Sequence, residues 1–281
     1  MKVSGFTVCQ SVARLEYPVV EVIQSALPIV DEFIVNVGPS EDETLNLIRS
    51  IDSPKLRVIQ SEWDESIRKD GLLFSTVTNI ALSQCCGDWA LYLQADEVLH
   101  ERDHDGIRTV LTEHLNNKTV LGVSFRFLHF YGDYCSTNPW GFHRAVRIIR
   151  NNGEVASCGD AVGFCLKADR GFLQSRHRDR LIQLDIPIYH YSYVKSARAM
   201  QDKARALERR YHGEQPRPEQ EALLQRDKYE FADYDVMKEF TGEHPAVMKK
   251  RVMQSNRLRP RINRWLNWRF YREVLRRGFR G

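Results

Sequence analysis

Apolar and polar positions alternate between strand-like and helix-like periods over the first hundred residues. Runs rich in β-branched and aromatic residues predict four strands, at 3–9, 31–37, 55–60 and 89–94. Apolar residues three to four positions apart predict helices between them, over 17–27, through Leu45 and Ile48, and over 73–85. This alternation favours right-handed crossovers and a mostly parallel, doubly wound α/β sheet. The loops after Val8, Val37 and Leu93 should then share one edge, where such sheets bind ligands.

The pattern changes after residue 100. A helix is predicted over 104–117 and strands over 121–132, 143–151 and 162–168, which suits hairpins and a mixed sheet. Met200, Ala204, Leu207 and Tyr211 mark one face of a helix that ends near Gly213. A polar connector (212–221) and two further helical segments follow. We therefore expect one domain over 1–211, with halves 1–100 and 101–211, and a helical extension over 212–281.

The composition is typical of a globular protein, with 42% apolar and 28% charged residues. No apolar run approaches the ~20 residues of a membrane-spanning helix, and the N-terminus lacks the features of an export signal. A cytoplasmic protein is expected. Its six cysteines (Cys9, Cys85, Cys86, Cys135, Cys158 and Cys165) form no CxxC pair, so we expect free thiols.

The net charge of +4 is unevenly distributed. Residues 257–281 hold nine arginines and one glutamate, so the rest of the chain is net acidic. Apolar residues at four-residue steps and tryptophans make this tail a basic amphipathic helix, which narrowly favours peripheral contact with an anionic membrane. A helix docked on the acidic body fits nearly as well. Nucleic acid is not an expected partner.

Two adjacent carboxylates, Asp96 and Glu97, follow the apolar run Leu91-Tyr92-Leu93. Acidic residues are common where a helix begins. At the end of a strand they also suit a divalent cation that bridges substrate phosphates, because Mg²⁺ and Mn²⁺ bind carboxylate oxygens and leave positions for phosphate.

The segment 78–99, TNIALSQCCGDWALYLQADEVL, resembles family 2 glycosyltransferases. The matching positions are Asn79, Ala81, Leu82, Gly87, Asp88, Trp89, Ala95, Asp96 and Glu97. Arg14-Leu15-Glu16 stands where the family has Arg-Asn-Glu, and Ser40, Asp42 and Thr44 match the loop after its second strand. RAVRIIRNNGEVASCGD (144–160) and HYSYVK (190–195) resemble two later family elements, so the likeness is collinear over about 3–210.

This resemblance implies a GT-A fold with a nucleotide-binding half (1–100) and an acceptor-binding half (101–211). It implies inverting transfer of a sugar from a nucleotide-diphosphate donor, with a UDP-sugar expected first, to a saccharide or lipid-linked glycan of the cell surface or lipopolysaccharide. A divalent cation, Mn²⁺ or Mg²⁺, would neutralise the leaving diphosphate.

The resemblance also implies roles for individual residues. Asp96 and His190 would bind the metal, Asp160 would be the general base with Glu97 beside the donor sugar, and Glu154 and Asp133 are reserve bases. Donor binding would fall to Arg14, Glu16, Asn36, Asp42, Asn79, Gln94, Ala95, Asp96 and Lys195. The aromatic segment 127–144 offers Tyr131, Trp140 and His143 for the acceptor. Each also has a structural interpretation: a turn for Asp160, packing for His190 and the aromatic residues, and a solvated surface for Lys195.

Two departures keep alternatives open. Gln94 replaces the first aspartate of the family's metal motif, which would also fit a non-catalytic glycan- or membrane-binding protein. Val37-Gly38 stand where the family often has an acid that contacts the nucleotide. A sugar-1-phosphate nucleotidyltransferase is a weaker alternative, because CQSVARLE (9–16) lacks the glycine-rich loop that such an enzyme would need.

Overall fold

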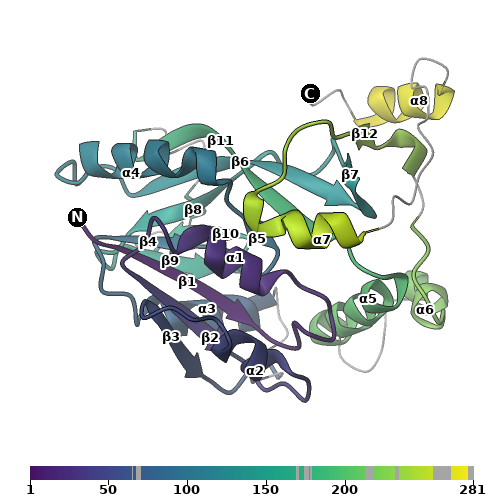
Figure 1. The fold of residues 1–281 in the computed structure, drawn as a ribbon, viewed down its shortest axis with the longest axis horizontal. Coiled ribbons are helices and arrows are strands. Elements are labelled where there is room, and N and C mark those ends of the chain that lie inside the picture. The colour runs from purple at the N-terminus through teal and green to yellow at the C-terminus, as the bar shows by residue number, and fades with distance from the viewer. Residues whose placement is uncertain are drawn as a thin grey trace.

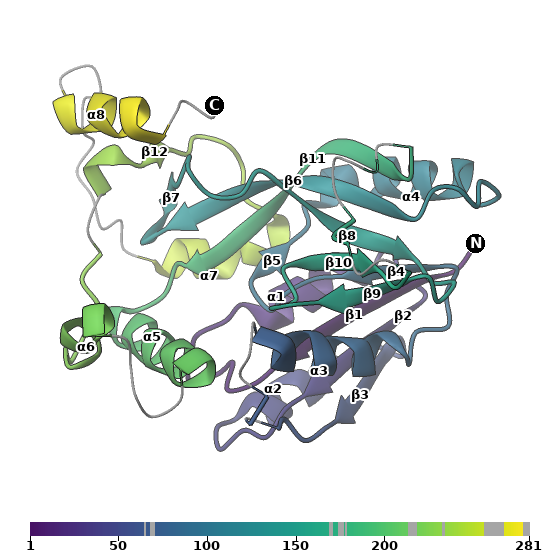
Figure 2. The same cartoon turned by 180° about the vertical axis from the view of Figure 1, so that it is seen from behind.

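The computed structural model describes residues 1–64, 66–67, 71–168, 171–173, 177, 179–212, 218–231, 234–255 and 267–277. Within these residues, one ten-stranded sheet forms the centre of the molecule, with a separate two-stranded sheet beside it. Figures 1 and 2 show helices on both faces of the large sheet. The α/β class predicted from the sequence is confirmed.

The first half of the chain forms parallel strands in the order β3-β2-β1-β4. Strands β1, β2 and β4 are almost wholly buried, as expected of parallel strands covered on both faces, whereas β3 at the edge is only half-buried. The elements are β1 (Val3–Cys9), α1 (Val19–Ala26), β2 (Glu32–Val37), α2 (Thr44–Arg49), β3 (Leu56–Gln60), α3 (Leu72–Leu82) and β4 (Trp89–Tyr92). Each lies within about three residues of its predicted range.

The second half is mixed, as predicted. Strand β8 (Arg144–Arg150) pairs antiparallel with both β4 and β6 (Gly122–Tyr131), which joins the two halves into one sheet. The long strand β11 (Leu181–Tyr193) runs parallel to β6. The other elements are β5 (Glu97–Val98), η2 (Glu101–Asp103), α4 (His104–Glu113), β7 (Asp133–Thr137), β9 (Val155–Cys158) and β10 (Gly163–Leu166). Strands β7, β9 and β11 had no predicted counterpart.

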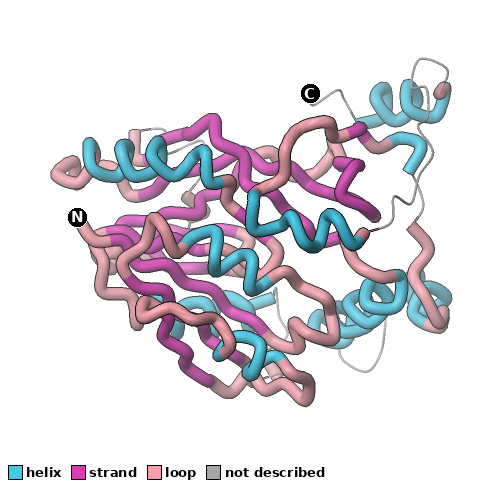
Figure 3. Tube along the Cα trace, viewed as in Figure 1, coloured by secondary structure: helices cyan, strands magenta, loops and turns pink. Residues whose placement is uncertain are grey.

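Two layers cover the sheet. Helices α1 and α4 lie on one face (Figure 1), and α3 with the β9–β10 hairpin lies on the other (Figure 2). Figure 3 shows α5 (Ala197–His212) beyond the ends of the parallel strands. The main cluster of buried apolar side chains extends from β1 and α1 to β6 and β11, so both halves share it.

The C-terminal extension contains α6 (Pro218–Leu224), η4 (Tyr234–Val236), β12 (Lys238–Glu239), η5 (Ala246–Met248), α7 (Lys249–Gln254) and α8 (Trp268–Arg277). Its contacts with the body include the pairing of β12 with β7 and a 2.7 Å ion pair between Arg251 of α7 and Glu21 of α1. Within the basic tail, 256–266 and 278–281 lie outside the described residues. No described helix combines the length and apolar character needed to cross a bilayer.

Candidate active site

A cavity of about 260 Å³ opens at the carboxyl ends of the parallel strands. Its walls are the loops after β1 and β4, the turn between β9 and β10, and one face of α5. The loop after β2 adjoins it, because the Gln10 side chain donates a 2.7 Å hydrogen bond to the Pro39 carbonyl. The loops predicted to share one edge therefore do. We call this space the strand-end cavity; its polar lining includes Gln10, Gln94, Asp96, Asp160, Lys203 and Arg210.

Asp96 places a carboxylate in this cavity although the residue is only 5% exposed. Its Oδ1 lies 3.5 Å from Nε2 of His190, a residue of β11. Burial alone would raise the pKa of the Asp96 carboxyl. The His190 ring and the nearby ammonium groups of Lys203 and Lys195 outweigh burial, so the pKa lies well below its usual range. Asp96 is therefore a buried anion held by cationic neighbours.

A second histidine stands behind the first. Nδ1 of His129, on β6, lies 2.7 Å from Nδ1 of His190, and Nε2 of His129 lies 2.8 Å from the Phe142 carbonyl. Burial, followed by the nearby His190, lowers the pKa of His129 to about 4. The two rings therefore connect Asp96 to the loop before β8.

Glu97, adjacent in sequence, has the opposite environment. The residue is fully buried, and its two carboxylate oxygens accept hydrogen bonds of 2.6 and 2.7 Å from the Arg147 guanidinium. Arg147 also donates a 2.7 Å bond to the Val162 carbonyl. Glu97 does not line the cavity; it holds Arg147, and through it the strand end that follows Asp160.

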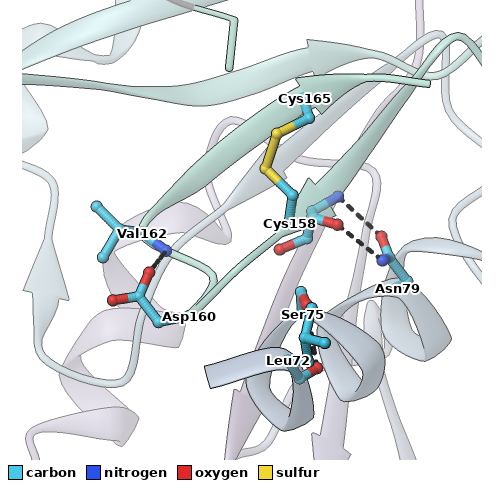
Figure 4. The surroundings of a disulfide bond; sticks show 8 residues. Leu72, Ser75, Asn79, Cys158, Asp160, Val162 and Cys165 are labelled. Atoms are coloured by element: carbon cyan, nitrogen blue, oxygen red, sulfur yellow. Dashed lines mark hydrogen bonds between the residues drawn. A yellow bond between two sulfur atoms is a disulfide. The ribbon is translucent and has the colours of Figure 1, made fainter. Parts of the chain in front are cut away.

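The turn between β9 and β10 carries Asp160 into the strand-end cavity. Gly159 and Ala161, on either side, have φ values of 58° and 60°, a region that is unfavourable for alanine and has to be held by its surroundings. The Asp160 carboxylate accepts a 3.2 Å hydrogen bond from the Val162 amide (Figure 4).

Two predicted donor-binding residues hold this turn. The Gln94 amide donates a 3.2 Å hydrogen bond to the Ala161 carbonyl, which an aspartate carboxylate could not do. Asn79 of α3 uses both amide atoms on the Ser157 backbone, at 2.9 and 3.0 Å (Figure 4). Gln94 lines the cavity as well, whereas Asn79 does not.

The expectation of six free thiols is wrong. Cys158 and Cys165 form a disulfide across the β9–β10 hairpin, with their Cα atoms 5.9 Å apart (Figure 4). A spacing of seven residues resembles no metal or redox motif, so their pairing becomes evident only once the hairpin brings the two cysteines together. Cys9, Cys85, Cys86 and Cys135 are free, as expected.

Other predicted donor-binding residues brace the loops around the cavity without lining it. Asp42 accepts a 2.7 Å hydrogen bond from the Arg14 amide, and Glu16 accepts two 2.7 Å bonds from the Ser196 amide and hydroxyl. The buried side-chain amide of Asn36 bonds the Val77 carbonyl at 3.0 Å. These contacts fix the loops after β1 and β2 to each other and to the start of α5.

Lys195 is buried, not solvated. Its ammonium donates a 2.8 Å hydrogen bond to the Leu15 carbonyl and lies 3.5 Å from the centre of the Tyr17 ring. Burial, with the repulsion of Lys203, lowers the pKa of Lys195 to about 7. Ala95, in contrast, lines the cavity as predicted.

Helix α5 supplies cavity residues that the sequence interpretation missed. Lys203, Leu207, Arg210 and Tyr211 line the cavity at spacings of four, three and one residues, which place them on one helical face. The apolar members of this spacing were visible in the sequence. Lys203 and Arg210 lie next to these apolar positions in the sequence and could have been assigned to the same face of the helix.

The indole of Trp63 packs closely against Gly38. A side chain added at Gly38 would meet the Trp63 ring at 2.5 Å, so glycine is required there. Trp63 and Phe74 line the strand-end cavity with their rings edge to face, 6.3 Å apart. The Arg210 guanidinium lies 5.3 Å from the centre of each ring.

A second cavity, of about 230 Å³, lies on the other side of the histidine pair. We call it the aromatic cavity. Its lining includes His129, Trp140, Phe142, His143, and Phe270 and Val274 of α8. Two of the predicted acceptor residues, Trp140 and His143, therefore lie together. Tyr131 does not line it and instead packs against Tyr193 and Phe231.

The described part of the basic tail docks on the body. Phe270 of α8 packs against Trp140, and Arg269 forms a 2.9 Å ion pair with Asp235. Trp268 and Leu275 on the same helix are 68% and 85% exposed. One face of α8 thus closes the aromatic cavity while another remains open.

A divalent cation fits the carboxylate–imidazole pair of Asp96 and His190. The described residues contain no cluster of three or more His, Cys, Asp or Glu side chains. The protein would therefore supply two ligands and leave the remaining positions to phosphate and water, as in sites that bind a metal with its nucleotide. The reserve acids lie elsewhere: Glu154 is exposed and Asp133 is buried in β7.

Comparisons with known proteins give glycosyltransferases. No family model matches the chain. It is 26% identical over 162 residues to an uncharacterized glycosyltransferase of Rickettsia typhi, which covers 57% of this chain and 50% of that protein. A second uncharacterized glycosyltransferase, from Rickettsia prowazekii, is 29% identical over 109 residues, 39% of this chain and 33% of that one. The chain thus spans half or less of the length of these curated relatives.

Solved structures that resemble the chain include TarS of S. aureus, with 15% identity, a TM-score of 0.44, and coverage of 74% of this chain and 39% of that one. Glucosyl-3-phosphoglycerate synthase from Mycobacterium tuberculosis, in complex with Mn²⁺, UDP and glucosyl-3-phosphoglycerate, has 15% identity and a TM-score of 0.42. The match covers 74% of this chain and 79% of that one.

Proposed function

We propose that this protein is a glycosyltransferase that transfers a sugar from a nucleotide-diphosphate donor, a UDP-sugar first, to a saccharide or lipid-linked glycan. The observation that carries the proposal is the buried Asp96 carboxylate, paired with His190 in a polar cavity at the ends of parallel strands. The names of the curated relatives support it.

The cavity suits a diphosphate because Lys203 and Arg210 line it and the buried Asp96 carboxylate can hold a cation beside the phosphates. Asp96 and His190 would hold Mn²⁺ or Mg²⁺, and the nitrogen ligand favours Mn²⁺. When bound, this cation would neutralise charge on the leaving diphosphate. Lys203 and Arg210 line the same space and supply further positive charge. Trp63 and Phe74 offer ring faces to a nucleobase.

Asp160 is the proposed general base. It projects from a turn held by Gln94, by Asn79 and, through Val162, by Arg147. In an inverting displacement the acceptor hydroxyl attacks the anomeric carbon while its proton passes to a carboxylate within hydrogen-bond reach. The aromatic cavity, with Trp140 and His143, is the proposed acceptor site, because aromatic rings pack against the CH faces of sugars.

The position of Gln94 weakens the argument for a non-catalytic protein. This residue has exchanged a metal ligand's charge for a hydrogen bond to the base-bearing turn. The glutamine therefore has a structural use and does not by itself favour a non-catalytic protein.

The test combines binding with turnover. Thermal midpoints should be measured with UDP-, GDP-, CMP- and dTDP-sugars, each with and without Mn²⁺, for the native chain, Asp96→Asn and Asp160→Asn. We expect one donor to raise the midpoint, more so with Mn²⁺, Asp96→Asn to abolish the rise, and Asp160→Asn to retain it. Turnover of that donor should fall about 10²- to 10⁴-fold in Asp160→Asn.

Asp179→Asn, at a carboxylate 75% exposed, is the matched control and should behave like the native chain. A midpoint that no nucleotide sugar changes would overturn the proposal. A donor response that survives in Asp96→Asn would remove Asp96 from the site.

A further inference from the structure

His129 takes no part in the proposed chemistry, yet its ring is held from several sides. It packs edge to face against Phe142 with centroids 4.5 Å apart and stacks on Phe127 at 5.6 Å. A side chain at Gly141 would collide with the imidazole, so a glycine is needed to admit the ring. The ring of His129 is therefore fixed in orientation and can control what it touches.

The two contacts of His129 determine where its protons lie. A carbonyl oxygen only accepts hydrogen bonds, so Nε2 of His129, 2.8 Å from the Phe142 oxygen, carries a hydrogen. In the neutral imidazole Nδ1 is then bare and accepts. Its partner at 2.7 Å, Nδ1 of His190, must be the donor.

The consequence appears on the far side of the second ring. A histidine that binds a metal must be neutral, and a neutral His190 that carries its hydrogen on Nδ1 has its lone pair on Nε2. That atom lies 3.5 Å from Oδ1 of Asp96. A nitrogen lone pair and a carboxylate oxygen at this separation are close enough to bind one cation together.

We infer that His129 is a positioning residue that fixes the tautomer and orientation of His190, so that Nε2 of His190 and the Asp96 carboxylate together bind a divalent cation. This inference rests on the proposed function. Histidine ligands commonly donate their second N–H to an acceptor, and loss of that acceptor typically weakens metal binding about 10- to 100-fold. Here the acceptor is a second imidazole, itself anchored on the loop that lines the aromatic cavity.

Two substitutions separate the contacts of His129. In His129→Asn, the amide oxygen replaces Nδ1 and still accepts from His190, while the bond to Phe142 is lost. In His129→Gln, the amide nitrogen replaces Nε2 and keeps the bond to Phe142, while the acceptor for His190 is lost. The pair is matched in chemistry and differs in which contact remains.

Mn²⁺ binding to the full chain should be titrated by electron paramagnetic resonance, alone and with UDP. We expect His129→Asn to stay within about threefold of the native Kd and His129→Gln to weaken it about 10- to 100-fold, with His190→Ala weaker still. His114→Asn, at a half-exposed histidine just after α4 that lines neither cavity, should leave Mn²⁺ affinity unchanged. Histidine ¹⁵N spectra of the native chain with Mg²⁺ and UDP should show Nε2–H for His129 and Nδ1–H for His190.

Equal Mn²⁺ affinity in the native chain and His129→Gln would overturn the inference and leave the proposed function intact. Loss of affinity in His129→Asn equal to that in His129→Gln would also overturn it, because anchoring to Phe142 would then be the role of the ring. A native chain that binds no Mn²⁺ with UDP would overturn this inference and the metal part of the proposed function together. The spectra decide the tautomers even if a variant does not fold: a hydrogen on Nε2 of His190 would refute the assignment.

Discussion

The two cavities of this protein are built in different ways. The strand-end cavity is made by short loops at the ends of parallel strands, each fixed by side chains that bond backbone groups, as Asp42, Glu16 and Lys195 do. The aromatic cavity is made by a loop and by α8, more than a hundred residues apart in sequence. His190 connects Asp96 to His129, which lines the aromatic cavity.

Two buried carboxylates beside the strand-end cavity show how the protein accommodates negative charge in its interior. Asp96 and Glu97 are neighbours, and both are buried. Glu97 is neutralised by a two-armed bond to Arg147, whereas Asp96 faces a histidine and lies near two buried lysines. Of these two buried carboxylates, Glu97 is fully used in holding the structure, whereas Asp96 lines the strand-end cavity and is available to a ligand.

The largest expected effect comes from breaking the satisfied pair. Arg147→Met leaves Glu97 buried without its partner, so we expect the free energy of unfolding to fall by about 3–5 kcal/mol in chemical denaturation. The double variant Glu97→Met, Arg147→Met removes both charges and should recover most of the loss. Asp185→Asn, at an exposed pair with Arg126, should cost less than about 1 kcal/mol. An equal loss in the single and double variants would show that packing, and not the unpaired charge, is responsible.

The same contrast explains what could be predicted from sequence. The parallel half follows from local periodicity, and the strand-end position of Asp96 follows from the loop after β4. Strand β11 was not predicted, although its first half alternates between half-buried and exposed residues, because Pro187 interrupts the run and a segment without clear periodicity precedes it. The disulfide depends on the pairing of β9 with β10, and the Arg147–Glu97 pair joins residues fifty positions apart, so neither follows from local periodicity.

Residues that match the sequence motif fall into two groups, those that line the strand-end cavity and those that only support it. Asp96, Gln94 and Ala95 line the cavity because sequence motif and strand end coincide. Asn79 matches the motif equally well, yet its amide is fully used on Ser157. A motif match identifies which side chains converge near a site and cannot say which of them face the ligand. Only the packing of the β9–β10 hairpin decides that.

An intermediate effect is expected in the aromatic cavity. Trp140→Ala removes the ring that Phe270 packs against, and with it a sugar-facing surface. We expect the KM for the acceptor to rise about tenfold, equivalent to the 0.5–1.5 kcal/mol of an aromatic contact, while the Kd for the donor is unchanged. Phe270→Ala should have a smaller effect in the same direction. Steady-state kinetics with the acceptor varied would check both, and a change in donor Kd instead would show that the two cavities are not separate in function.

The last effect is a dependence on pH, and it concerns the buried cation near Asp96. Burial lowers the pKa of Lys195 to about 7 from a usual value near 10.5. Between these values the unfolded chain binds more protons than the folded one, so the free energy of unfolding should increase with pH, at a slope approaching 1.4 kcal/mol per pH unit for this group. Below pH 7 the contribution is constant, and the cost of burying the charge is paid in full. Denaturation of the native chain and Lys195→Met at pH 7, 8 and 9 should give a difference between them that changes in this window, whereas Lys250→Met, at an exposed lysine, should give a constant one. A pH-independent difference for Lys195→Met would mean that the ammonium stays charged over Tyr17 throughout, and that the strand-end cavity keeps one more cation than the lowered pKa of Lys195 implies.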